Sequence, residues 1–558
     1  MKQDIFHHDN LIFFDGAMGT MIQAAGLNSG ELPEGFNITR PEVIESIHQA
    51  YREAGADVTT TNTFGANRLK LGPAGYTPEQ MVKAAVAIAR KAAGNGPVAL
   101  DIGPLGQLMA PMGTLSFSEA YDLFAPQMKA GQNAGADFVL IETMSDLYEA
   151  KAAVLAAREN TRLPVVCTLT FQKNGRTLMG NDPLTVVTVL ESLGVEALGI
   201  NCSLGPEDLL PLVKQFADVS HVPILVQPNA GLPELVGGRP VFPLTPVAFA
   251  DSVEKMADMG IKMVGGCCGT DPNFIKELRS RLGDRKYRKP DNPKRTAAAS
   301  ARQTVFFDRG FRLIGQRIDP SGREDLAEAI RKGETDPLYE EAMLQKQAGA
   351  EILSINVYTG DPNEGDAMVK AVEAIQAMIP VPLQLSSSDY RVLEAGARVA
   401  NGKPVVHAVN GSRESMEQIF PIVRKYGACV VGRTLDENGI PCRAEDSLAI
   451  AEKILETAAG YGIPREDILI DCLVRGIAPE TGAARETLKA VSLVKRELGG
   501  RTLLDIGGVS REEEGRPARN GVYLAMAMGA GLDAAMADPT AGEIREVIRA
   551  YRDLIATD

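Results

Sequence analysis

Three cysteines in two similar settings are the side chains of this 558-residue chain whose type and spacing best suit chemistry. Cys267 and Cys268 are adjacent and follow an apolar run and a Gly-Gly turn, and Cys202 follows a similar apolar run beside glycine. Adjacent cysteines do not readily form a disulfide with each other, because the bond would be strained. Three thiolates that converge from two strand ends could instead bind one zinc ion and leave its fourth position open for a substrate.

A structural role is the alternative for each thiol, because a free cysteine usually behaves as a small buried hydrophobe. One isolated cysteine would favour that interpretation, but three cysteines at strand ends beside glycines favour a metal site. Zinc-bound sulfur stays a thiolate near neutral pH, since the metal lowers the thiol pKa. A thiol substrate in the open position would become a nucleophile in the same way and could accept an alkyl group.

The elements that must position these cysteines alternate between short β-rich runs and longer helical stretches. In the first half of the chain the expected strands are residues 11–14, 57–61, 97–102, 137–142, 164–171, 197–202, 223–227 and 263–267. Strands that alternate with helices in this way are typical of a (β/α)8 barrel, whose functional groups gather at the carboxyl ends of the strands. Cys202 ends the sixth expected strand and Cys267 ends the eighth, so we expect all three cysteines at one rim.

The second half of the chain repeats this rhythm. The expected strands are residues 312–318, 351–357, 382–386, 404–409, 428–435, 468–473, 502–506 and 534–537. We therefore predict an α/β protein with two tandem (β/α)8 TIM barrels, the first at residues 1–284 and the second at residues 306–558. The stretch between them, 285–305, is basic and contains proline before an alanine-rich run, which predicts a solvated linker rather than a nucleic-acid patch.

Composition and net charge argue against several classes of protein. A net charge of −14 argues against binding to nucleic acid and against attraction to anionic membranes. No apolar run approaches the length of a membrane span, and the N-terminal residues lack the pattern of a signal peptide. The seven cysteines, an odd number scattered along the chain, fit a reducing compartment, so we expect a cytoplasmic protein.

Polar residues are expected at the same rim as the cysteines. Asp15 and Gly16 follow the first strand, Glu142 ends the fourth, Asn201 precedes Cys202, and Asn229 follows the seventh strand. Carboxylates could bind an ammonium group, while the backbone NH groups of the glycine-rich turn could bind a carboxylate. Together these groups predict a pocket for a zwitterionic amino acid. A turn or helix-cap role is the alternative for Asp15 and Asn229.

Six motifs of the first barrel resemble the homocysteine S-methyltransferase family and stand in the family's order. They are Asp15-Gly16-Ala17-Met18-Gly19-Thr20, residues 61–66, residues 101–104, Glu142-Thr143, residues 199–203 and residues 265–270. The resemblance implies zinc on Cys202, Cys267 and Cys268, with homocysteine sulfur as the incoming ligand. It also implies that Asp15, Gly16, Glu142 and Asn201 bind the amino acid. Asn229 matches a position close to the metal, where it would be a ligand in the absence of substrate.

The second barrel resembles the methyltetrahydrofolate-binding barrel of the cobalamin-dependent methionine synthase family. The matching stretches are residues 314–323, 425–441, 461–467 and 525–539. The resemblance implies a pterin-binding type of barrel. The pterin-site residues that it indicates are Asp319, Asn356, His407, Asp471 and Arg519.

Several positions depart from the pterin-site pattern of that family. Gln316 replaces a glutamate, Ser386 replaces an aspartate, Asp319 and His407 replace asparagines, and Gly508 stands where an asparagine is expected. A pterin presents adjacent hydrogen-bond donors that carboxylates satisfy strongly, so these changes remove acceptor strength. We therefore hypothesise that this barrel binds methyltetrahydrofolate weakly or has changed its ligand.

Two of the replacing residues could protonate the pterin, a step for which the lost asparagine would have supplied a polar partner. Asp319 and His407 could each act as an acid, although His407 could equally be a satisfied polar residue at the rim. The acidic residues 512–514 are expected to form a solvated loop.

The expected function is that of a zinc-dependent homocysteine S-methyltransferase that makes methionine. These residues contain no Asp-x-His-x-x-Gly corrinoid-binding loop, so methylcobalamin or another corrinoid is expected from a separate corrinoid protein, with methyltetrahydrofolate as the upstream donor. One alternative keeps the first barrel and uses another donor, such as a betaine or a sulfonium compound. Another makes the second barrel a docking module for a corrinoid protein.

Overall fold

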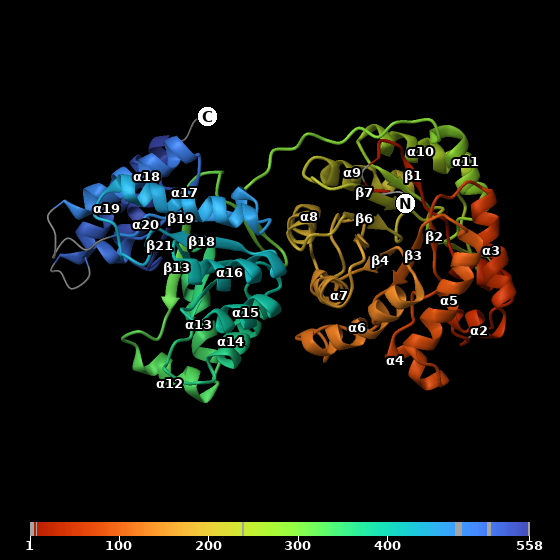
Figure 1. Cartoon of the computed structure of the whole chain (residues 1–558), viewed down its shortest axis with the longest axis horizontal. Coiled ribbons are helices and arrows are strands. Elements are labelled where there is room, and N and C mark those ends of the chain that lie inside the picture. The colour runs from red at the N-terminus through yellow and green to blue at the C-terminus, as the bar shows by residue number, and fades with distance from the viewer. Residues whose placement is uncertain are drawn as a thin grey trace. The chain divides into compact units, whose positions relative to one another are not determined.

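The computed structural model describes residues 5–6, 8–28, 30–236, 239–474, 482–510 and 515–555. The chain divides into two compact units, Met1–Pro293 and Lys294–Asp558 (Figure 1). The predicted acidic loop at residues 512–514 lies outside the described residues.

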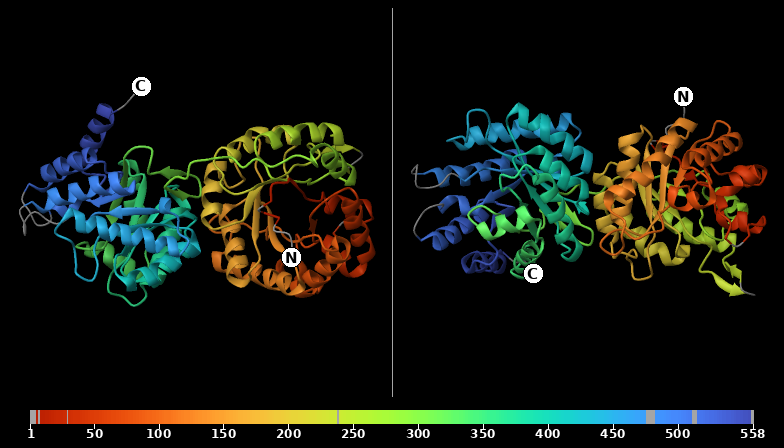
Figure 2. Two further views of the ribbon diagram at one scale, coloured as in Figure 1. Left: turned by 45° about the horizontal axis from the view of Figure 1, so that its top comes forward. Right: turned by 90° about the horizontal axis from the view of Figure 1, so that it is seen from below.

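The first unit is built on a parallel sheet of eight strands in the order β1-β10-β7-β6-β5-β4-β3-β2. The two end strands meet where the amide of Val58 donates to the carbonyl oxygen of Phe13 at 3.1 Å, so the sheet curves into a ring (Figure 2, left). All eight predicted strands are confirmed in position. They are β1 (Ile12–Phe13), β2 (Thr59–Thr60), β3 (Val98–Ile102), β4 (Phe138–Met144), β5 (Val165–Leu169), β6 (Ala197–Asn201), β7 (Ile224–Gln227) and β10 (Met263–Val264).

Helices surround this ring, and their ends are set by local capping signals. The helix α5 begins with a capping box of Thr77 and Gln80, and α6 begins with one of Ser116 and Glu119. Gly135 ends α6 in the left-handed conformation, with φ of 93°. The helices are α1 (Gly19–Ala24), α2 (Phe36–Thr39), α3 (Pro41–Glu53), α4 (Arg68–Leu71), α5 (Pro78–Ala93), α6 (Phe117–Ala134), α7 (Leu147–Asn160), α8 (Pro183–Ser192), α9 (Pro206–Ala217), α10 (Pro246–Asp258) and α11 (Pro272–Leu282). A short antiparallel pair, β8 (Glu234–Val236) and β9 (Arg239–Val241), lies between β7 and α10.

An apolar core fills the first ring, and the N-terminal segment contributes to it. Ile5 and Phe6 are buried with inward residues of the strands, including Phe14 and Phe138. The ring of Phe138 packs edge-on against both Phe6 and Phe14, with centroid distances of 5.7 and 6.1 Å. Because this core supports the strands from within, their carboxyl ends are held as a stable platform for polar residues.

The second unit contains a closed parallel barrel, and its eight strands also agree with the predicted ones. They are β13 (Arg312–Ile318), β14 (Ile352–Asn356), β15 (Leu383–Ser386), β17 (Val405–Asn410), β18 (Cys429–Arg433), β19 (Ile468–Asp471), β20 (Arg501–Asp505) and β21 (Ala534–Ala537). Its helices are α12 (Glu324–Lys332), α13 (Asp336–Gln347), α14 (Glu364–Met378), α15 (Tyr390–Val399), α16 (Arg413–Tyr426), α17 (Ala444–Gly460), α18 (Ala483–Leu498), α19 (Arg516–Gly529) and α20 (Gly542–Ile555). The two-barrel architecture predicted from the sequence is confirmed.

The predicted linker at residues 285–305 is the part of the architecture that the structure corrects. The amide of Tyr287 donates to the carbonyl oxygen of Asp9 at 2.7 Å, so the basic stretch is bound to the first unit. The alanine-rich run forms β11 (Ala297–Ser300), which pairs with β12 (Thr304–Phe306) and with β16 (Gly402–Lys403). Small side chains let this run become fully buried against the second barrel, where Ala298 is part of the core. The alanine-rich part is therefore not a solvated connector, whereas residues 285–295 are exposed or half-buried as predicted.

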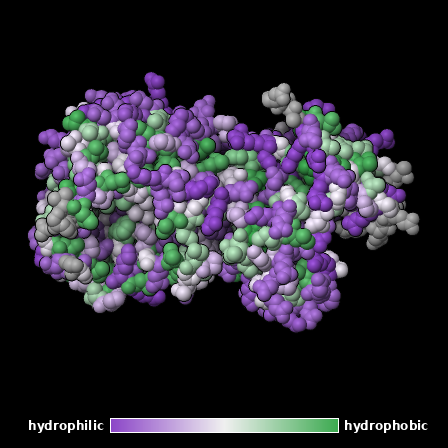
Figure 3. Space-filling view, turned by 180° about the vertical axis from the view of Figure 1, so that it is seen from behind, coloured by the Kyte–Doolittle hydropathy of each residue, from purple (hydrophilic) through white to green (hydrophobic). Residues whose placement is uncertain are grey.

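The surface mixes polar and apolar residues. Hydrophilic side chains cover most of the face that Figure 3 shows, and apolar residues are scattered among them. Within the described ranges, no helix combines the length and the apolar character needed to cross a lipid bilayer.

Candidate metal centre and amino-acid pocket

The three cysteines predicted as metal ligands lie together at one rim of the first barrel. Their Sγ atoms all lie within 4.8 Å of one another, and the Sγ atoms of Cys202 and Cys268 are 3.9 Å apart. Zn–S bonds of about 2.3 Å in a tetrahedral site place sulfur atoms roughly 3.8 Å apart. The sulfur cluster therefore fits a tetrahedral metal ion with three protein ligands.

The last residue of β7 and the segment that follows it hold the backbones of all three cysteines. The amide of Cys202 donates to the carbonyl oxygen of Gln227 at 3.0 Å, and the amide of Cys267 donates to that of Pro228 at 2.8 Å. The carbonyl oxygen of Cys268 accepts from the amide of Ala230 at 2.9 Å. Because β7 lies between β6 and β10 in the sheet, one segment can fix ligands from both neighbouring strands.

Glycine is required immediately before the cysteine pair. A Cβ atom on Gly266 would lie 2.4 Å from Oγ1 of Thr270, and one on Gly265 would lie 2.8 Å from Cβ of Phe14. Thr270 in turn donates from Oγ1 to the carbonyl oxygen of Cys267 at 2.7 Å and closes the turn. The Gly-Gly signal in the sequence therefore reflects close packing at this rim.

Backbone strain concentrates at the same rim. Cys202 and Ser203 adopt φ of 63° and 59°, and Thr143, which follows Glu142, adopts 61°. These left-handed values are uncommon for residues other than glycine, and a β-branched residue such as Thr143 is rare there. Such conformations persist where the surrounding structure enforces them, and they are frequent at functional sites.

The three thiols differ in their pKa values. Hydrogen bonds from Cys267 and Cys268 lower the pKa of Cys202 to about 3. The hydrogen bond to Cys202 raises the pKa of Cys267 well above its usual range, and it raises that of Cys268 to about 12. One thiolate is thus stabilised by two protonated neighbours, which a divalent cation could replace as it binds.

Asn229 provides a fourth group beside the sulfur cluster. Its side chain hydrogen-bonds to Cys202 and helps to lower the pKa of that thiol. Its Oδ1 atom is buried and has no hydrogen-bond partner in the described part of the chain. A buried polar atom without a partner costs free energy that a bound metal or water would recover. These residues fit the metal that the sequence predicts.

Asp15 is a buried carboxyl group two residues after β1, and Glu142 is a half-buried one near the end of β4. The two oxygens of Asp15 accept from the amide and the hydroxyl of Thr60, each at 2.7 Å. Burial raises the pKa of Asp15 to about 7, although Thr60 opposes the change. Burial, followed by the charges of Cys202 and Asp15, raises the pKa of Glu142 to about 8. Both groups lack a cationic partner strong enough to keep their pKa values low, which suits a pocket that receives an ammonium group.

Asn201 orients the end of β4. Its Oδ1 accepts from the amide of Thr143 and the hydroxyl of Thr168, both at 2.8 Å. Its Nδ2 donates to Oγ1 of Thr143 at 2.7 Å and to Glu142 at 3.3 Å. These bonds use the amide within the protein, so its contribution in this structure is to hold Glu142 in place.

Tyr51 links the two glycine-rich motifs and was missed in the sequence. Its hydroxyl donates to the carbonyl oxygen of Ala17 at 2.9 Å and contacts that of Thr270 at 3.2 Å. A Cβ atom on Gly16 would lie 2.8 Å from the Tyr51 hydroxyl, which explains the glycine there. A single tyrosine on the apolar face of α3 carries no sequence signal that separates it from a core residue.

Four of the five residues predicted for the pterin site lie on, or directly after, strands β13, β14, β17 and β19 of the second barrel. Nδ2 of Asn356 donates to Oδ1 of Asp319 at 3.2 Å. His407 lies with Nδ1 3.2 Å from Oγ of Ser386, and burial lowers its pKa to about 4, so the ring is neutral. Asp471 is buried, which raises its pKa to about 6. Arg519 is exposed on α19.

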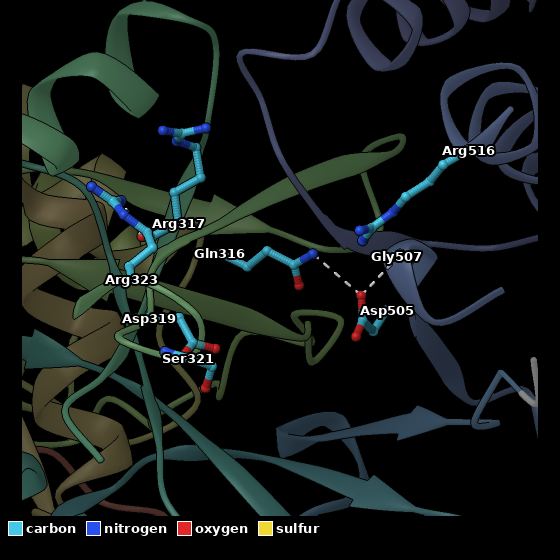
Figure 4. A pocket seen from close by; sticks show the side chains of 8 residues that line it. All are labelled: Gln316, Arg317, Asp319, Ser321, Arg323, Asp505, Gly507 and Arg516. Carbon is cyan, nitrogen blue, oxygen red and sulfur yellow. Dashed lines mark hydrogen bonds between the residues drawn. The ribbon is translucent and has the colours of Figure 1, made fainter. Parts of the chain in front are cut away.

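A pocket of about 260 Å³ opens at one rim of the second barrel (Figure 4). Of the predicted pterin-site residues, only Asp319 lines it. In Figure 4 the side chain of Gln316 points toward Asp505, to which its Nε2 donates at 3.3 Å, and Arg516 extends toward Gly507. The lining residues are Gln316, Arg317, Asp319, Ser321, Arg323, Asp505, Gly507 and Arg516. Asp505 could have been found as the end of the seventh predicted strand, whereas Arg516 lies on a helix and carries no such signal.

Two family models match the chain, one in each unit. Residues 12–282 match the model of the homocysteine S-methyltransferases, and residues 325–537 match that of the pterin-binding enzymes. The first match runs from β1 to α11, whereas the second runs from α12 to β21 and leaves out β13.

Named relatives agree with these matches. Methionine synthase of Mycobacterium tuberculosis is 31% identical over 560 residues, which cover 94% of this chain and 47% of that protein. Methionine synthase of Mycobacterium leprae is 30% identical over 570 residues, with the same coverage of 94% and 47%. The chain thus spans about half the length of the curated relatives that it matches.

Among solved structures, the metallated form of the homocysteine methyltransferase MmuM from Escherichia coli is 25% identical. That match covers 49% of this chain and 97% of that chain, with a TM-score of 0.43. One family model thus matches each half of the chain. The first unit is therefore similar to the homocysteine S-methyltransferases over residues 12–282, and the second is similar to the pterin-binding enzymes over residues 325–537.

Proposed function

We propose that this protein transfers a methyl group to the sulfur of homocysteine and forms methionine. The observation that carries the proposal is the convergence of three Sγ atoms within 4.8 Å at a barrel rim that also carries Asp15 and Glu142. Cys202, Cys267 and Cys268 would bind zinc, with Asn229 beside them. Zinc held there would act as a Lewis acid that lowers the pKa of a substrate thiol.

The residues of the chain would bind and align the amino acid. Asp15 and Glu142 would accept hydrogen bonds from its ammonium group. The amide of Ala17 is bonded to Thr270, so the backbone NH groups of the turn beyond Ala17 would bind its carboxylate. This clamp holds the sulfur at the metal rim, where its lone pair attacks the methyl carbon of the donor. The S–C bond forms as the bond from the methyl carbon to the donor breaks, and that electron pair leaves with the donor.

We propose a methylated corrinoid, supplied by a corrinoid protein, as the donor, with methyltetrahydrofolate as the upstream source of the methyl group. The likeness to methionine synthases and the pterin-binding match of the second unit support this. The three thiols of the proposed site must stay reduced to bind a metal, so we propose that the protein acts in the cytoplasm. The acidic chain is proposed to act without nucleic acid or membrane partners.

A second candidate keeps the reaction on homocysteine and takes the methyl group from another donor. The observation that favours it is the second barrel, where Ser386 and neutral His407 bond to each other at a place that needs strong acceptors for a pterin. In that case the second unit would be a divergent ligand site or a docking module for a corrinoid protein.

The test is methionine formation from homocysteine by the zinc-loaded full chain. Methylcobalamin, methyltetrahydrofolate, both together, a betaine and a sulfonium compound are compared as donors. We expect turnover with methylcobalamin, and little gain from methyltetrahydrofolate without a corrinoid. Turnover only with a betaine or a sulfonium donor would establish the second candidate, and no turnover with any donor would contradict the proposed reaction.

Calorimetric titration with methyltetrahydrofolate tests the second unit separately. We expect binding weaker than micromolar, because acceptors for the pterin edge have been lost. Micromolar affinity, together with a normal rate of methyl transfer, would show that the altered residues still form a working folate site.

A further inference from the structure

A third acidic residue, Asp101, belongs to the polar rim of the first barrel. Asp101 lies on β3, two residues after Ala99, whose side chain is part of the barrel core. Because side chains alternate along a strand, Asp101 points inward as Ala99 does. By the same alternation Glu142 on β4 follows the core residue Leu140 inward, and Asp101 pairs with Leu140 across the two strands.

The backbone around Asp101 is fixed from both sides. Its amide donates to Oγ1 of Thr61 at 3.0 Å, and its carbonyl oxygen accepts from Oγ1 of Thr63 at 2.7 Å. Two residues later, the amide of Gly103 donates to the carbonyl oxygen of Phe64 at 3.0 Å. A Cβ atom on Gly103 would lie 2.6 Å from the Phe64 ring, so the two loops pack in contact. The carboxyl group is therefore presented from a rigid backbone.

The carboxyl group itself lacks a donor. Asp101 is only 6% exposed, and its buried Oδ1 has no hydrogen-bond partner in the described structure. Burial raises the pKa of Asp101, and the charges of Glu142, Glu34 and Asp15 raise it further. The cation that opposes this effect is Lys70, whose Nζ donates to the carbonyl oxygen of Pro104 at 3.2 Å and so is engaged elsewhere.

A second unpartnered acceptor lies on the other side of the ring. Gln227 on β7 is 4% exposed, and its buried Oε1 also has no hydrogen-bond partner among the described residues. Gln227 follows the core residue Leu225 by two positions, so its side chain also points inward. The pocket thus offers buried acceptors from two sides, and a ligand that brings N–H donors would satisfy them.

We propose that Asp101 is a specificity-determining residue that binds the α-ammonium group of the amino-acid substrate together with Glu142. The proposal rests on the proposed function, because homocysteine supplies the ammonium group. An ammonium group has three N–H donors, so it can bond Asp101, Glu142 and Asp15 at once. A thiol without an amino group would leave Oδ1 of Asp101 unpartnered, and the pocket would reject it.

The test compares two thiols on the zinc-loaded full chain by calorimetric titration. L-Homocysteine carries the amino group, whereas 4-mercaptobutyrate keeps the thiol and carboxylate and lacks it. We expect wild type to prefer homocysteine by roughly a hundredfold or more, since a lost charged hydrogen bond weakens binding by about 10- to 100-fold. Asp101→Asn should weaken homocysteine binding by about 10- to 100-fold and leave 4-mercaptobutyrate binding unchanged.

Kinetics provide a second measurement. Asp101 does not touch the reacting sulfur, so in Asp101→Asn the KM for homocysteine should rise while kcat stays within about threefold of wild type. Glu149→Gln is the matched control. Glu149 is another buried carboxyl group of the first barrel, but it already accepts from the amide of Leu105 at 2.7 Å, so the preference should not change.

The outcomes separate this inference from the proposed function. If wild type does not bind homocysteine, the proposed function fails and the role of Asp101 fails with it. If wild type binds homocysteine but prefers it to 4-mercaptobutyrate by less than about threefold, the role of Asp101 is overturned together with the ammonium-binding roles of Asp15 and Glu142, while methyl transfer to homocysteine stands. An unchanged preference in Asp101→Asn overturns only the role of Asp101. If Asp101→Asn does not fold, Asp101→Ser takes its place.

Discussion

Cys202 is the residue on which the charge of the metal centre concentrates. Its thiolate accepts hydrogen bonds from Cys267 and Cys268, and its backbone is held at φ of 63°. The two other thiols carry the protons that a cation would displace. The three residues act as a unit, so removal of any one leaves two sulfurs that cannot complete the site.

We expect Cys202→Ser, Cys267→Ser and Cys268→Ser each to lose bound zinc and to lower methyl transfer by at least about a hundredfold, because a hydroxyl is a poor zinc ligand. Zinc content by atomic emission and the rate of methionine formation are the measurements. Cys442→Ser is the control, since that thiol is exposed and far in sequence from the centre. A variant of the three that kept full zinc and full rate would remove that cysteine from the ligand set.

His48 is a buried residue with a measurable dependence on pH. Both ring nitrogens lack hydrogen-bond partners in the described structure, and burial lowers the pKa of His48 to about 4. The unfolded chain binds a proton below a pKa of about 6.5, whereas the folded chain does not until about 4. The folded state therefore loses stability as the pH falls from about 6.5 to 4, by about 3 kcal/mol from this residue.

His48→Leu should remove this loss. We expect the variant to be at least as stable as wild type at pH 8 and more stable at pH 5, because leucine leaves no unsatisfied nitrogen. Urea unfolding of the first unit at both pH values is the measurement. If His48→Leu changed the free energy of unfolding by the same amount at pH 5 and pH 8, the pKa of His48 would not be lowered by burial.

At the scale of elements, the two glycine-rich turns after β1 and β10 are packed against each other through Tyr51 and Thr270. The amide of Ala17 donates to Oγ1 of Thr270 at 3.1 Å, and Tyr51 bridges the carbonyl oxygens of Ala17 and Thr270. The turn proposed to bind the amino acid is thus tied to the turn that carries two of the proposed metal ligands. A change that separates the turns should disturb both sites.

Gly266→Ala tests this coupling. The added Cβ would lie 2.4 Å from Oγ1 of Thr270, so the turn must shift, and we expect a loss of about 1–3 kcal/mol together with weaker zinc binding. Gly19→Ala is the matched control, because a Cβ there meets nothing within 4 Å at the start of α1. Chemical unfolding and zinc titration provide both measurements. If both substitutions lowered the free energy of unfolding and the zinc affinity equally, Gly266 would not be closely packed against Thr270.

The sequence predicted the regular elements of both barrels, because their hydrophobic runs and glycine stops are local signals. It also placed the three cysteines at one rim, since strand order alone brings the ends of β6 and β10 together. It did not reveal Asp101 as part of the pocket, because a carboxyl group within a strand shows neither which way it points nor which donors it lacks. The alanine run at 297–300 was misassigned because alanine has a low preference for strands, and one of its two partner strands, β16, lies about a hundred residues later.

At the scale of the whole molecule, the boundary between the units falls at Pro293 and Lys294. The hairpin of β11 and β12 belongs to the second barrel, where Ala298 and Val305 join its core and Sγ of Cys429 contacts the carbonyl oxygen of Ala297 at 3.1 Å. This hairpin is therefore part of the second folding unit.

Two shortened polypeptides test that boundary. We expect residues 294–558 to fold cooperatively, whereas residues 306–558 should lose at least about 3 kcal/mol or fail to fold, because their core would be exposed where the hairpin is missing. Circular dichroism during urea unfolding is the measurement. If the two polypeptides were equally stable, the hairpin would be a linker and not part of the second folding unit.

The placement of the metal ligands on separate strands has a consequence for biosynthesis. Cys202 and Cys268 are 66 positions apart, so a metal bound between them would be a removable crosslink around a long loop. By the chain-entropy estimate used for disulfides, such a crosslink restricts the unfolded chain by about 4 kcal/mol. At roughly 5–20 residues per second, a ribosome makes Cys268 about 3 to 13 seconds after Cys202. The crosslink therefore forms late, and it secures a barrel whose strands have already been made.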